Sequence, residues 1–389
     1  MSELAGQERR GLLLGFGVFG VFWGAWSAVL PAVERQAGVR DGVLGLALGA
    51  LAVSAVPAMP LAGRLVDRVG ARWALPGAML VFALVTPLTG LATGTRSLVA
   101  AMVVLGAATG VLDVVLNTAT AGWERNTGRP LMSTAHGLFS VGVLAGSAAA
   151  GLARQGGADV LVILFAVMGL VGMTLARQPL YRRPASEAAA AGLRGSRAVL
   201  LGLGILTACA FLFEDAVQSW SALHLERGLG ASPGISGLGP ALFAGSMAVG
   251  RLSGGRLGAR FSQERLLAGC AVVAAAGVLV VALAGNQAVA LLGLVLAGAG
   301  TSILAPVLYT AVGTRAAAGR QGADLATVTA LGYLGFVAGP PLVGGLSAST
   351  TLPIALACLA AFAIAIALAG PYLLSLSRSG TPVGGPGSR

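Results

Sequence analysis

The sequence predicts an all-α integral membrane protein with twelve transmembrane helices in two parallel six-helix halves. Composition is the first reason: 56% of the 389 residues are hydrophobic and only 10% are charged, whereas a soluble chain is nearer one quarter charged. The second reason is a series of apolar runs of about 20 residues, the length that crosses a bilayer. The third reason is that short stretches of the first half recur in the second half.

The expected spans follow one another with short loops between them. We place them at 11–33, 43–63, 73–94, 97–122, 132–154, 159–178, 199–223, 235–256, 265–285, 287–312, 325–348 and 350–375. The first run is long enough to span the membrane and is not followed by a cleavage site. We therefore expect an uncleaved first helix rather than a signal peptide.

The two halves are related by a shift of about 192 residues. GRLVDRVG (63–70) returns as GRLGARFS (255–262), and GAATGVLDVVLNTA (106–119) returns as GAGTSILAPVLYTA (298–311). Parallel repeats of this kind are related by an axis along the membrane normal. The expected boundaries are an N-terminal half over 1–178, a cytoplasmic linker over 179–198, a C-terminal half over 199–376 and a disordered cytoplasmic tail over 377–389.

Glycines spaced by four residues fall on the second, fifth, eighth and eleventh expected spans. They are Gly45/Gly49, Gly142/Gly146, Gly250/Gly254 and Gly335/Gly339. This spacing lets two helix backbones approach closely. With 60 glycines in the chain, chance is an equally good explanation, and both interpretations stay open.

The net charge of +11 is carried by arginine alone, since all 25 basic residues are arginines. Five of them fall in loops on one side of the expected bundle: Arg35, Arg40, Arg96, Arg154 and Arg227. The other 20, Arg251 among them, are assigned to the side of the two termini. By the positive-inside rule both termini are cytoplasmic, in a multi-pass protein of the cell membrane. Basic clusters that follow topology in this way argue against nucleic-acid binding.

The chain lacks the usual signs of an enzyme or of a cofactor. Cys209, Cys270 and Cys358 stand alone in apolar stretches and predict neither a disulfide nor a metal site. No metal-ligand spacing, nucleotide-binding loop or nucleophile elbow occurs. We therefore expect no enzyme activity, no metal and no cofactor. Without a nucleotide-binding loop, any transport across the membrane must be driven by a gradient.

Two polar stripes run through apolar spans, and each contains an acid. Around Asp113 the helix face carries Thr109, Asn117 and Thr120, and around Glu214 it carries Thr207, Gln218 and Ser221. An acid inside the membrane is costly and usually faces a cavity or a partner. We expect Asp113, Asn117, Glu214 and Gln218 to line a substrate or proton pathway, with a buried structural hydrogen bond as the alternative.

Asp215, next to Glu214, has mostly apolar neighbours on its own face. We expect it to hydrogen-bond to a neighbouring helix rather than to line the pathway. Adjacent helical residues point about 100° apart, so the two acids cannot line one wall equally.

Three further residues are candidates for the pathway. His136 can relay a proton because imidazole titrates near neutral pH, or it can make a helix-packing hydrogen bond. Trp23 and Trp26 form an aromatic stripe on the first span that either floors a binding site or packs against another helix.

The loop after the second expected span carries GRLVDRVGAR (63–72). This stretch resembles the loop signature of the major facilitator superfamily, Gly-x-x-x-Asp-Arg-x-Gly-x-Arg, with Gly63, Asp67, Arg68, Gly70 and Arg72 at the signature positions. The resemblance implies the major facilitator fold and secondary transport. It also implies a gating loop, for which we expect Asp67 to approach the start of the eleventh span near Leu325. Arg68 or Arg72 should approach Glu124.

Further stretches are similar to the fucose-permease-like branch of this family, including its YbjJ-like bacterial members. They are DVVLN with WERNTGRPLMSTAHGLFSVG (113–142), EDAVQSWSALHL (214–225) and GYLGFVAGPPLVG (332–344). In that branch the fourth helix carries an acid and, four residues on, an asparagine, here Asp113 and Asn117. The first span lacks the acid that fucose permease has there, so sugar specificity is not carried over.

The resemblance implies a monomeric transporter of a small polar, sugar-like or other organic solute across the bacterial cytoplasmic membrane, with the proton gradient as its driving force. Two alternatives remain. Proton-driven efflux of a drug or secondary metabolite would require a mostly apolar cavity beyond the acids. A non-transporting receptor or scaffold would require a folded extramembrane domain or a long tail, and we expect neither.

Overall fold

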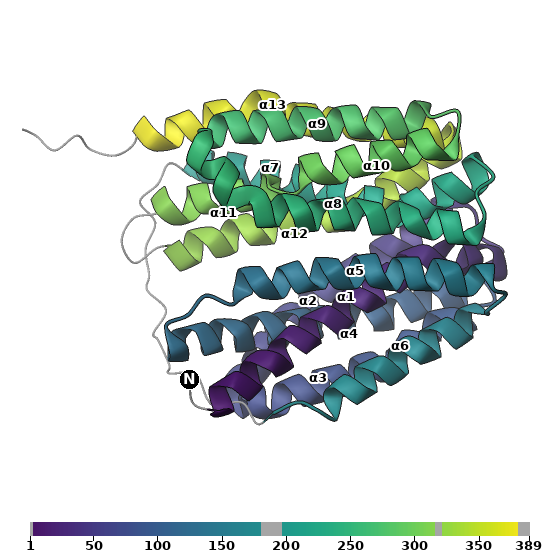
Figure 1. Ribbon diagram of the computed structural model, residues 1–389, viewed down its shortest axis with the longest axis horizontal. Helices are drawn as coiled ribbons and strands as arrows, with labels where there is room; N and C mark the ends of the chain where they lie inside the picture. Colours follow the sequence, from purple (N-terminus) through teal and green to yellow (C-terminus); the bar gives the residue numbers. More distant parts are fainter. Residues whose placement is uncertain (1–2, 180–196, 316–320, 380–389) are drawn as a thin grey trace, which may run out of the picture.

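The computed structural model describes residues 3–179, 197–315 and 321–379. Most of the expected linker (179–198) and of the expected tail (377–389) lies outside these residues. In the described part the chain is built from helices joined by short connections (Figure 1). The all-helical prediction is therefore confirmed.

The helices of each half follow the expected spans. The first six spans are α1 (Glu3–Ala37), α2 (Asp41–Val69), α3 (Ala71–Val85) with the 3-10 helix η1 (Thr86–Leu91), α4 (Thr95–Thr127), α5 (Met132–Gln155) and α6 (Val160–Leu175). The second six are α7 (Arg197–Leu223) with the π turn η2 (His224–Gly228), α8 (Pro233–Arg260), α9 (Gln263–Leu283), the pair α10 (Gln287–Thr301) and α11 (Leu304–Arg315), α12 (Gln321–Ser349) and α13 (Leu352–Ser379). The twelve-span architecture agrees with the prediction.

The two sets of helices pack in the same pairs. Helix α1 packs against α5 as α7 packs against α12, α2 packs against α4 as α8 packs against α10, and α3 packs against α6 as α9 packs against α13. The two halves then meet mainly through α5 with α8 and α2 with α12. The internal repeat in the sequence is thus matched by a repeat of helix packing.

The bundle has two ends that are used as reference points below. The start of α1 and the end of α13 lie at the same end, which we call the terminal end and which is at the left of Figure 1. The connection from α1 to α2 and the turn η2 lie at the opposite end, which we call the distal end.

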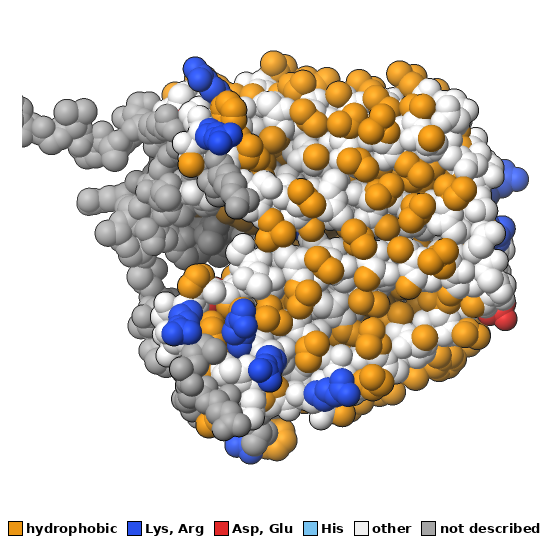
Figure 2. Space-filling model, in the orientation of Figure 1, with side chains coloured by type: hydrophobic (Ala, Val, Ile, Leu, Met, Phe, Trp, Pro, Cys, Tyr) orange, Lys and Arg blue, Asp and Glu red, His pale blue; other side chains and the backbone are white. Residues whose placement is uncertain are grey.

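The surface between the two ends is apolar. Large aliphatic side chains there are widely exposed, for example Leu368 of α13 at 75% and Val272 of α9 at 57%. Figure 2 shows apolar side chains across the middle of one face, with arginines gathered toward the ends. Large aliphatic side chains exposed over a whole belt are costly in water but suit a lipid environment.

Close helix contacts occur at the glycines spaced by four. A Cβ on Gly146 would lie 2.1 Å from the Val21 carbonyl oxygen, and one on Gly335 would lie 2.0 Å from the Ala208 carbonyl oxygen. Gly45 approaches the Pro340 carbonyl across the two halves in the same way, at 2.7 Å. At these positions the spacing reflects close packing, whereas a Cβ on Gly254 would meet only an ordinary contact with Ile303 at 3.6 Å.

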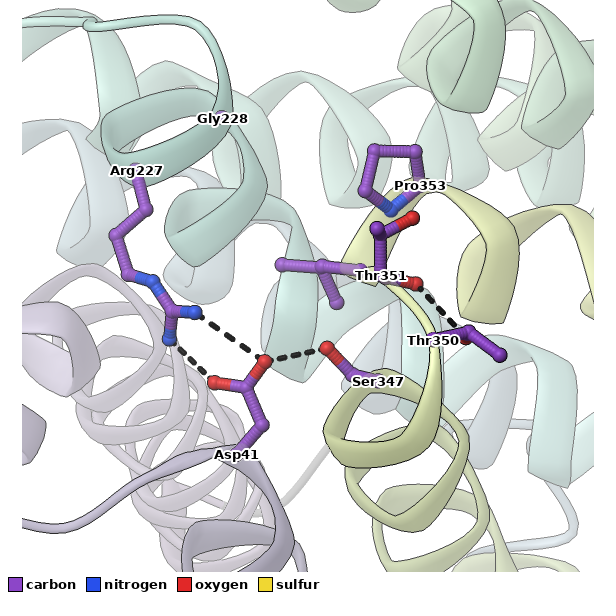
Figure 3. A pocket seen from close by; sticks show the side chains of 8 residues that line it. Asp41, Arg227, Gly228, Ser347, Thr350, Thr351 and Pro353 are labelled. Atoms are coloured by element: carbon purple, nitrogen blue, oxygen red, sulfur yellow. Dashed lines mark hydrogen bonds and ion pairs between the residues drawn. The ribbon is translucent and has the colours of Figure 1, made fainter.

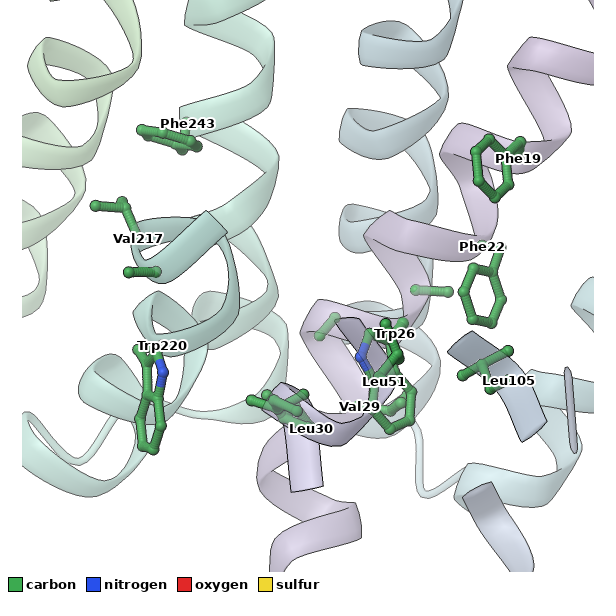
Figure 4. Packing of buried hydrophobic residues seen from close by; sticks show 14 of the residues in the cluster. Phe19, Phe22, Trp26, Val29, Leu30, Leu51, Leu105, Val217, Trp220 and Phe243 are labelled. Atoms are coloured by element: carbon green, nitrogen blue, oxygen red, sulfur yellow. The ribbon is translucent and has the colours of Figure 1, made fainter. Parts of the chain in front are cut away.

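The hydrophobic core reaches both halves near the distal end. Trp26 and Trp220, which stand at matching places in the repeat, are 2% and 0% exposed. Figure 4 shows them on either side of Leu30 of α1. This packing fixes the distal ends of α1 and α7 against each other.

Candidate functional site

Polar side chains from both halves meet inside the bundle. In the N-terminal half, Asn117 donates to a carboxylate oxygen of Asp113 at 3.0 Å, one helical turn away on α4. His136 of α5 lies 3.2 Å from the Asn117 side-chain oxygen. From the C-terminal half, Tyr333 of α12 donates its hydroxyl to the other Asp113 oxygen at 2.8 Å. Asp113 therefore sits at the boundary between the halves, with neutral donors on both of its oxygens.

The second acid forms an ion pair. Arg251 of α8 donates to both carboxylate oxygens of Glu214 at 3.1 and 3.3 Å. The same guanidinium donates to Ser140 of α5 at 3.1 Å, which lies in the other half. The side chains of Glu214 and Arg251 are each 23% exposed, so they are open to solvent although they lie inside the bundle.

This pair corrects one assignment made from the sequence. Arg251 was counted with the loop arginines of the terminal side, although the expected span 235–256 includes it. Helix α8 continues to Arg260, and Arg251 is part of the helix bundle. The polar side chains inside the bundle, called the polar group below, are Asp113, Asn117, His136, Tyr333, Glu214 and Arg251. This group contains a cation that charge counting had placed in a loop.

The other expected pathway residues take different places. Gln218 donates to the Ser27 hydroxyl of α1 at 3.3 Å, across the two halves. Asp215 interacts with Ser219, one turn further along its own helix; its expected bond to a neighbouring helix stays a prediction. Trp23 is half-buried, whereas Trp26 is packed in the core, so in this conformation only Trp23 is open to a pathway.

Aromatic rings of the C-terminal half surround the Asp113 contact. Phe211 stacks on Phe336 with ring centroids 4.6 Å apart, and Tyr333 lies 5.6 Å from Phe336. Tyr309 lies 6.3 Å from Phe211. All four rings are half-buried, so the polar group borders an aromatic wall.

The distal end is closed by ion pairs between the halves, which we call the distal seal. Arg35 of α1 binds Glu226 of η2 at 2.5 Å, and Arg227 of η2 binds Glu34 of α1 at 2.5 Å. Each half thus contributes a Glu-Arg dipeptide, and the arginine of each dipeptide binds the glutamate of the other. Residues 34–35 and 226–227 are related by the same shift as the two halves.

Three more residues complete the distal seal. Arg154 of α5, whose side chain is 4% exposed, binds Glu226 at 3.0 Å. Asp41 of α2 is bound by Arg227 and by the hydroxyl of Ser347 of α12. Asp41, Arg227 and Ser347 line a cavity of about 310 Å³ together with Thr350, Thr351 and Pro353. Figure 3 shows these side chains and the contacts of Asp41 with Arg227 and Ser347.

The expected gating loop lies at the terminal end. Asp67, Arg68 and Arg72 are exposed, and the Arg72 guanidinium lies 5.3 Å from the Trp73 ring centroid. Gly63 is half-buried, and Gly70 turns the chain from α2 to α3 with a φ of 77°. Glu124 accepts the backbone N–H groups of Leu131 and Met132 at 2.5 and 2.8 Å. The side chain of Leu325 lies outside the described residues, so the Asp67 contact stays a prediction.

Several functional candidates were missed from the sequence. Tyr333 and Arg251 contact acids on other helices, and no spacing within one helix indicates such contacts. The distal seal did leave a signal, because VERQAG (33–38) and LERGLG (225–230) align at the shift of 192 residues. Comparing charged residues between the repeats would have found it.

These features define a class of protein. Twelve spans in two similar halves, with ionisable groups on the boundary between the halves and a seal at one end, form the architecture of a rocking secondary transporter. The chain belongs to the Major Facilitator Superfamily, whose family model matches residues 12–206 and 203–388. This is a family of transporters and not of enzymes.

Relatives and solved structures agree with this membership. An uncharacterized MFS-type transporter of Yersinia pestis is 31% identical over 91% of this chain and 92% of its own length. Membrane protein MosC of Rhizobium meliloti is 28% identical over 94% and 90%. The D-xylose–proton symporter has the same fold, with a TM-score of 0.77 at 14% identity over 97% of this chain and 100% of that one.

Proposed function

We propose that this protein moves a small polar organic solute across the bacterial cytoplasmic membrane, that the proton gradient drives it, and that it works as a monomer by alternating access. The two bodies that rock are residues 1–178 and 199–376, with both termini in the cytoplasm. Under this orientation the distal seal faces the outside, and the polar group is reached from the cytoplasm.

The observation that carries the proposal is the position of Asp113 and Glu214. Each carboxylate takes part in a polar contact between the halves, Asp113 through Tyr333 and Glu214 through Arg251 and Ser140. Intramembrane carboxylates that can exchange protons mark proton pathways in transporters. A proton gained or lost at either acid therefore changes a contact that the halves must break when they rock.

The solute class is supported by the mixed surroundings of the acids. Hydroxyl, amide and imidazole groups lie beside half-buried aromatic rings, a combination that suits a polar molecule with an apolar face. Two solved neighbours carry small polar solutes: the xylose symporter and the nucleoside transporter NupG, which has a TM-score of 0.70 at 14% identity over 96% of this chain and 99% of that one. Identity this low supports the fold and leaves the solute to experiment.

The aromatic wall favours a second candidate, proton-driven efflux of a drug or secondary metabolite. Phe211, Tyr309 and Phe336 give the C-terminal side of the site a partly apolar lining. Efflux would carry the solute in the direction opposite to import with the same proton-binding acids.

The test is uptake into proteoliposomes from a panel of sugars, nucleosides and amphipathic drugs, with and without an imposed pH gradient. We expect at least one polar solute to accumulate only when the gradient is present. Accumulation of a drug in vesicles of inverted gradient would favour efflux. Transport that is independent of the gradient would refute proton coupling. If the protein neither transports nor binds any solute of the panel, the proposal as a whole is contradicted.

A further inference from the structure

The tenth span is broken in the middle. Helix α10 ends at Thr301 and α11 begins at Leu304. Pro306 lies four residues after Ser302 and has no N–H, so the Ser302 carbonyl lacks the helical hydrogen bond that it would otherwise accept. Ser302 is 1% exposed, and a buried carbonyl without a donor is costly.

Arg251 supplies the missing donor. Its Nε donates to the Ser302 carbonyl oxygen at 3.4 Å. The neighbouring Gly250 makes this approach possible, because a Cβ at that position would lie 2.1 Å from the Ser302 hydroxyl oxygen. The Gly250–Arg251 dipeptide thus holds α8 against the break and places the guanidinium on the free carbonyl.

The same guanidinium holds the acid of α7. Its Nη2 binds both oxygens of Glu214, and its Nη1 binds Ser140 in the other half. A guanidinium is planar and rigid, so its hydrogen bonds have a fixed geometry relative to one another. A change at Glu214 therefore alters the position of the group that braces the break.

We propose that Arg251 is a positioning residue that transmits the charge state of Glu214 to the break between α10 and α11. This inference rests on the proposed function, in which a proton binds the Glu214 carboxylate. While Glu214 is charged, its ion pair with Nη2 keeps Arg251 over the Ser302 carbonyl. When Glu214 is neutral, the ion pair is lost, the carbonyl loses its donor, and α11 moves at the break.

The N-terminal half provides a control within the same chain. Helix α4 is continuous, with Gly110 and Val114 at the places that match Ser302 and Pro306. Neutralising Asp113 removes a charge of the same kind, and Asp113 is bonded to Asn117 and Tyr333 rather than to Arg251.

The experiment measures hydrogen exchange of residues 304–315 and of the matched residues 112–123 in the purified full chain without solute. We expect Glu214→Gln to speed exchange of 304–315 by about tenfold, the size expected for losing a hydrogen bond to a charged group. Exchange of 112–123 should not change, and Asp113→Asn should leave 304–315 as in the wild type. Unchanged exchange of 304–315 in Glu214→Gln, or an equal rise in Asp113→Asn, would overturn the inference.

A second background tests the route through the carbonyl. Pro306→Ala restores an N–H that can bond to the Ser302 carbonyl, so in this variant Glu214→Gln should no longer affect residues 304–315. A persistent effect would mean that the signal bypasses Ser302, and the inference would be wrong. The exchange experiment uses neither solute nor gradient, so it is independent of the uptake assay. The proposed function can fail in the uptake assay while the response of α11 remains, and the response of α11 can be absent while uptake is observed.

Discussion

Helix α4 and the α10–α11 pair occupy matching places in the two halves, yet one is continuous and carries an acid while the other is broken. Along the repeat, Asp113 is matched by Ala305 and Val114 by Pro306. The acid of the C-terminal half stands instead on α7, as Glu214. Matching helices of the two halves therefore carry different functional side chains.

The partners of the two acids differ in the same sense. Asp113 is bonded to an amide and a phenol, whereas Glu214 is bonded to a guanidinium that also braces a helix break. The glycine contacts and helix pairs are common to both halves. The repeat thus supplies the scaffold, and the functional differences lie where the two copies depart from each other.

The largest effect should come from copying the break into the N-terminal half. Val114→Pro removes the donor to the Gly110 carbonyl and adds a ring clash, at a cost of about 3 kcal/mol or more. α4 has little room to relax, because even a Cβ on Gly110 would lie 2.6 Å from the Ala55 carbonyl oxygen. We expect a severe loss of monodisperse protein in size-exclusion chromatography.

Pro306→Ala is the matched control, since it removes the natural break and should fold as well as the wild type. If Val114→Pro also gives normal yield and melting temperature, the two halves tolerate a break equally. The contrast between a continuous α4 and a broken α10–α11 pair would then not reflect a structural requirement of either half.

A smaller effect, confined to coupling, is expected from the acid pair on α7. Glu214→Gln should abolish uptake driven by a pH gradient but spare solute exchange, because the proton site is lost while the solute site remains. Asp215→Asn, one residue away, should lower folded yield more than the activity of each folded molecule. Uptake and counterflow in proteoliposomes, normalised to folded protein, measure both. Normal gradient-driven uptake by Glu214→Gln would reverse the assignment of the two acids.

The smallest effect concerns two arginines of the distal seal that bind the same acid. Arg154 is 4% exposed and Arg35 is 56% exposed. Arg154→Gln removes the buried ion pair with Glu226, and losing such a hydrogen bond to a charged group costs about 1.5–3 kcal/mol. Losing an exposed pair such as Arg35–Glu226 costs less than about 1 kcal/mol. Opening of the distal end can be followed by maleimide labelling of Ala231→Cys, a position that is 5% exposed.

We expect Arg154→Gln to raise the labelling rate by about tenfold or more and Arg35→Gln by a few-fold at most, following these free energies. Equal rates in the two variants would show that burial does not determine the strength of the distal seal.

Much of the fold could be predicted from the sequence, because each span is a local property. An apolar run of sufficient length predicts a membrane helix wherever it lies, and the repeat predicts which helices correspond. The break at residues 302–303 was not predicted, since the apolar run continues through it. Pro306 was the available sign, because proline removes a hydrogen bond four residues earlier.

The candidate site was less predictable, since its contacts join distant helices. The spacing of Asp113 and Asn117 placed them on one helix face, where they hydrogen-bond to each other. It could not anticipate Tyr333, which comes from the other half, nor Arg251, which charge counting assigned to a loop. The roles of Asp113, Glu214 and His136 in transport remain predictions for the experiments above.

Duplication of a gene for a half-length chain would account for the exchanged Glu-Arg pairs of the distal seal. A surface carrying one such dipeptide near a two-fold axis is self-complementary, so two identical copies bind each other through a pair of equal contacts. The 2.5 Å distances of Arg35 to Glu226 and of Arg227 to Glu34 preserve that equality. On this history the seal would be older than the fused chain: a homodimer would already have closed its distal face, and fusion would have let α4 and the α10–α11 pair evolve separately.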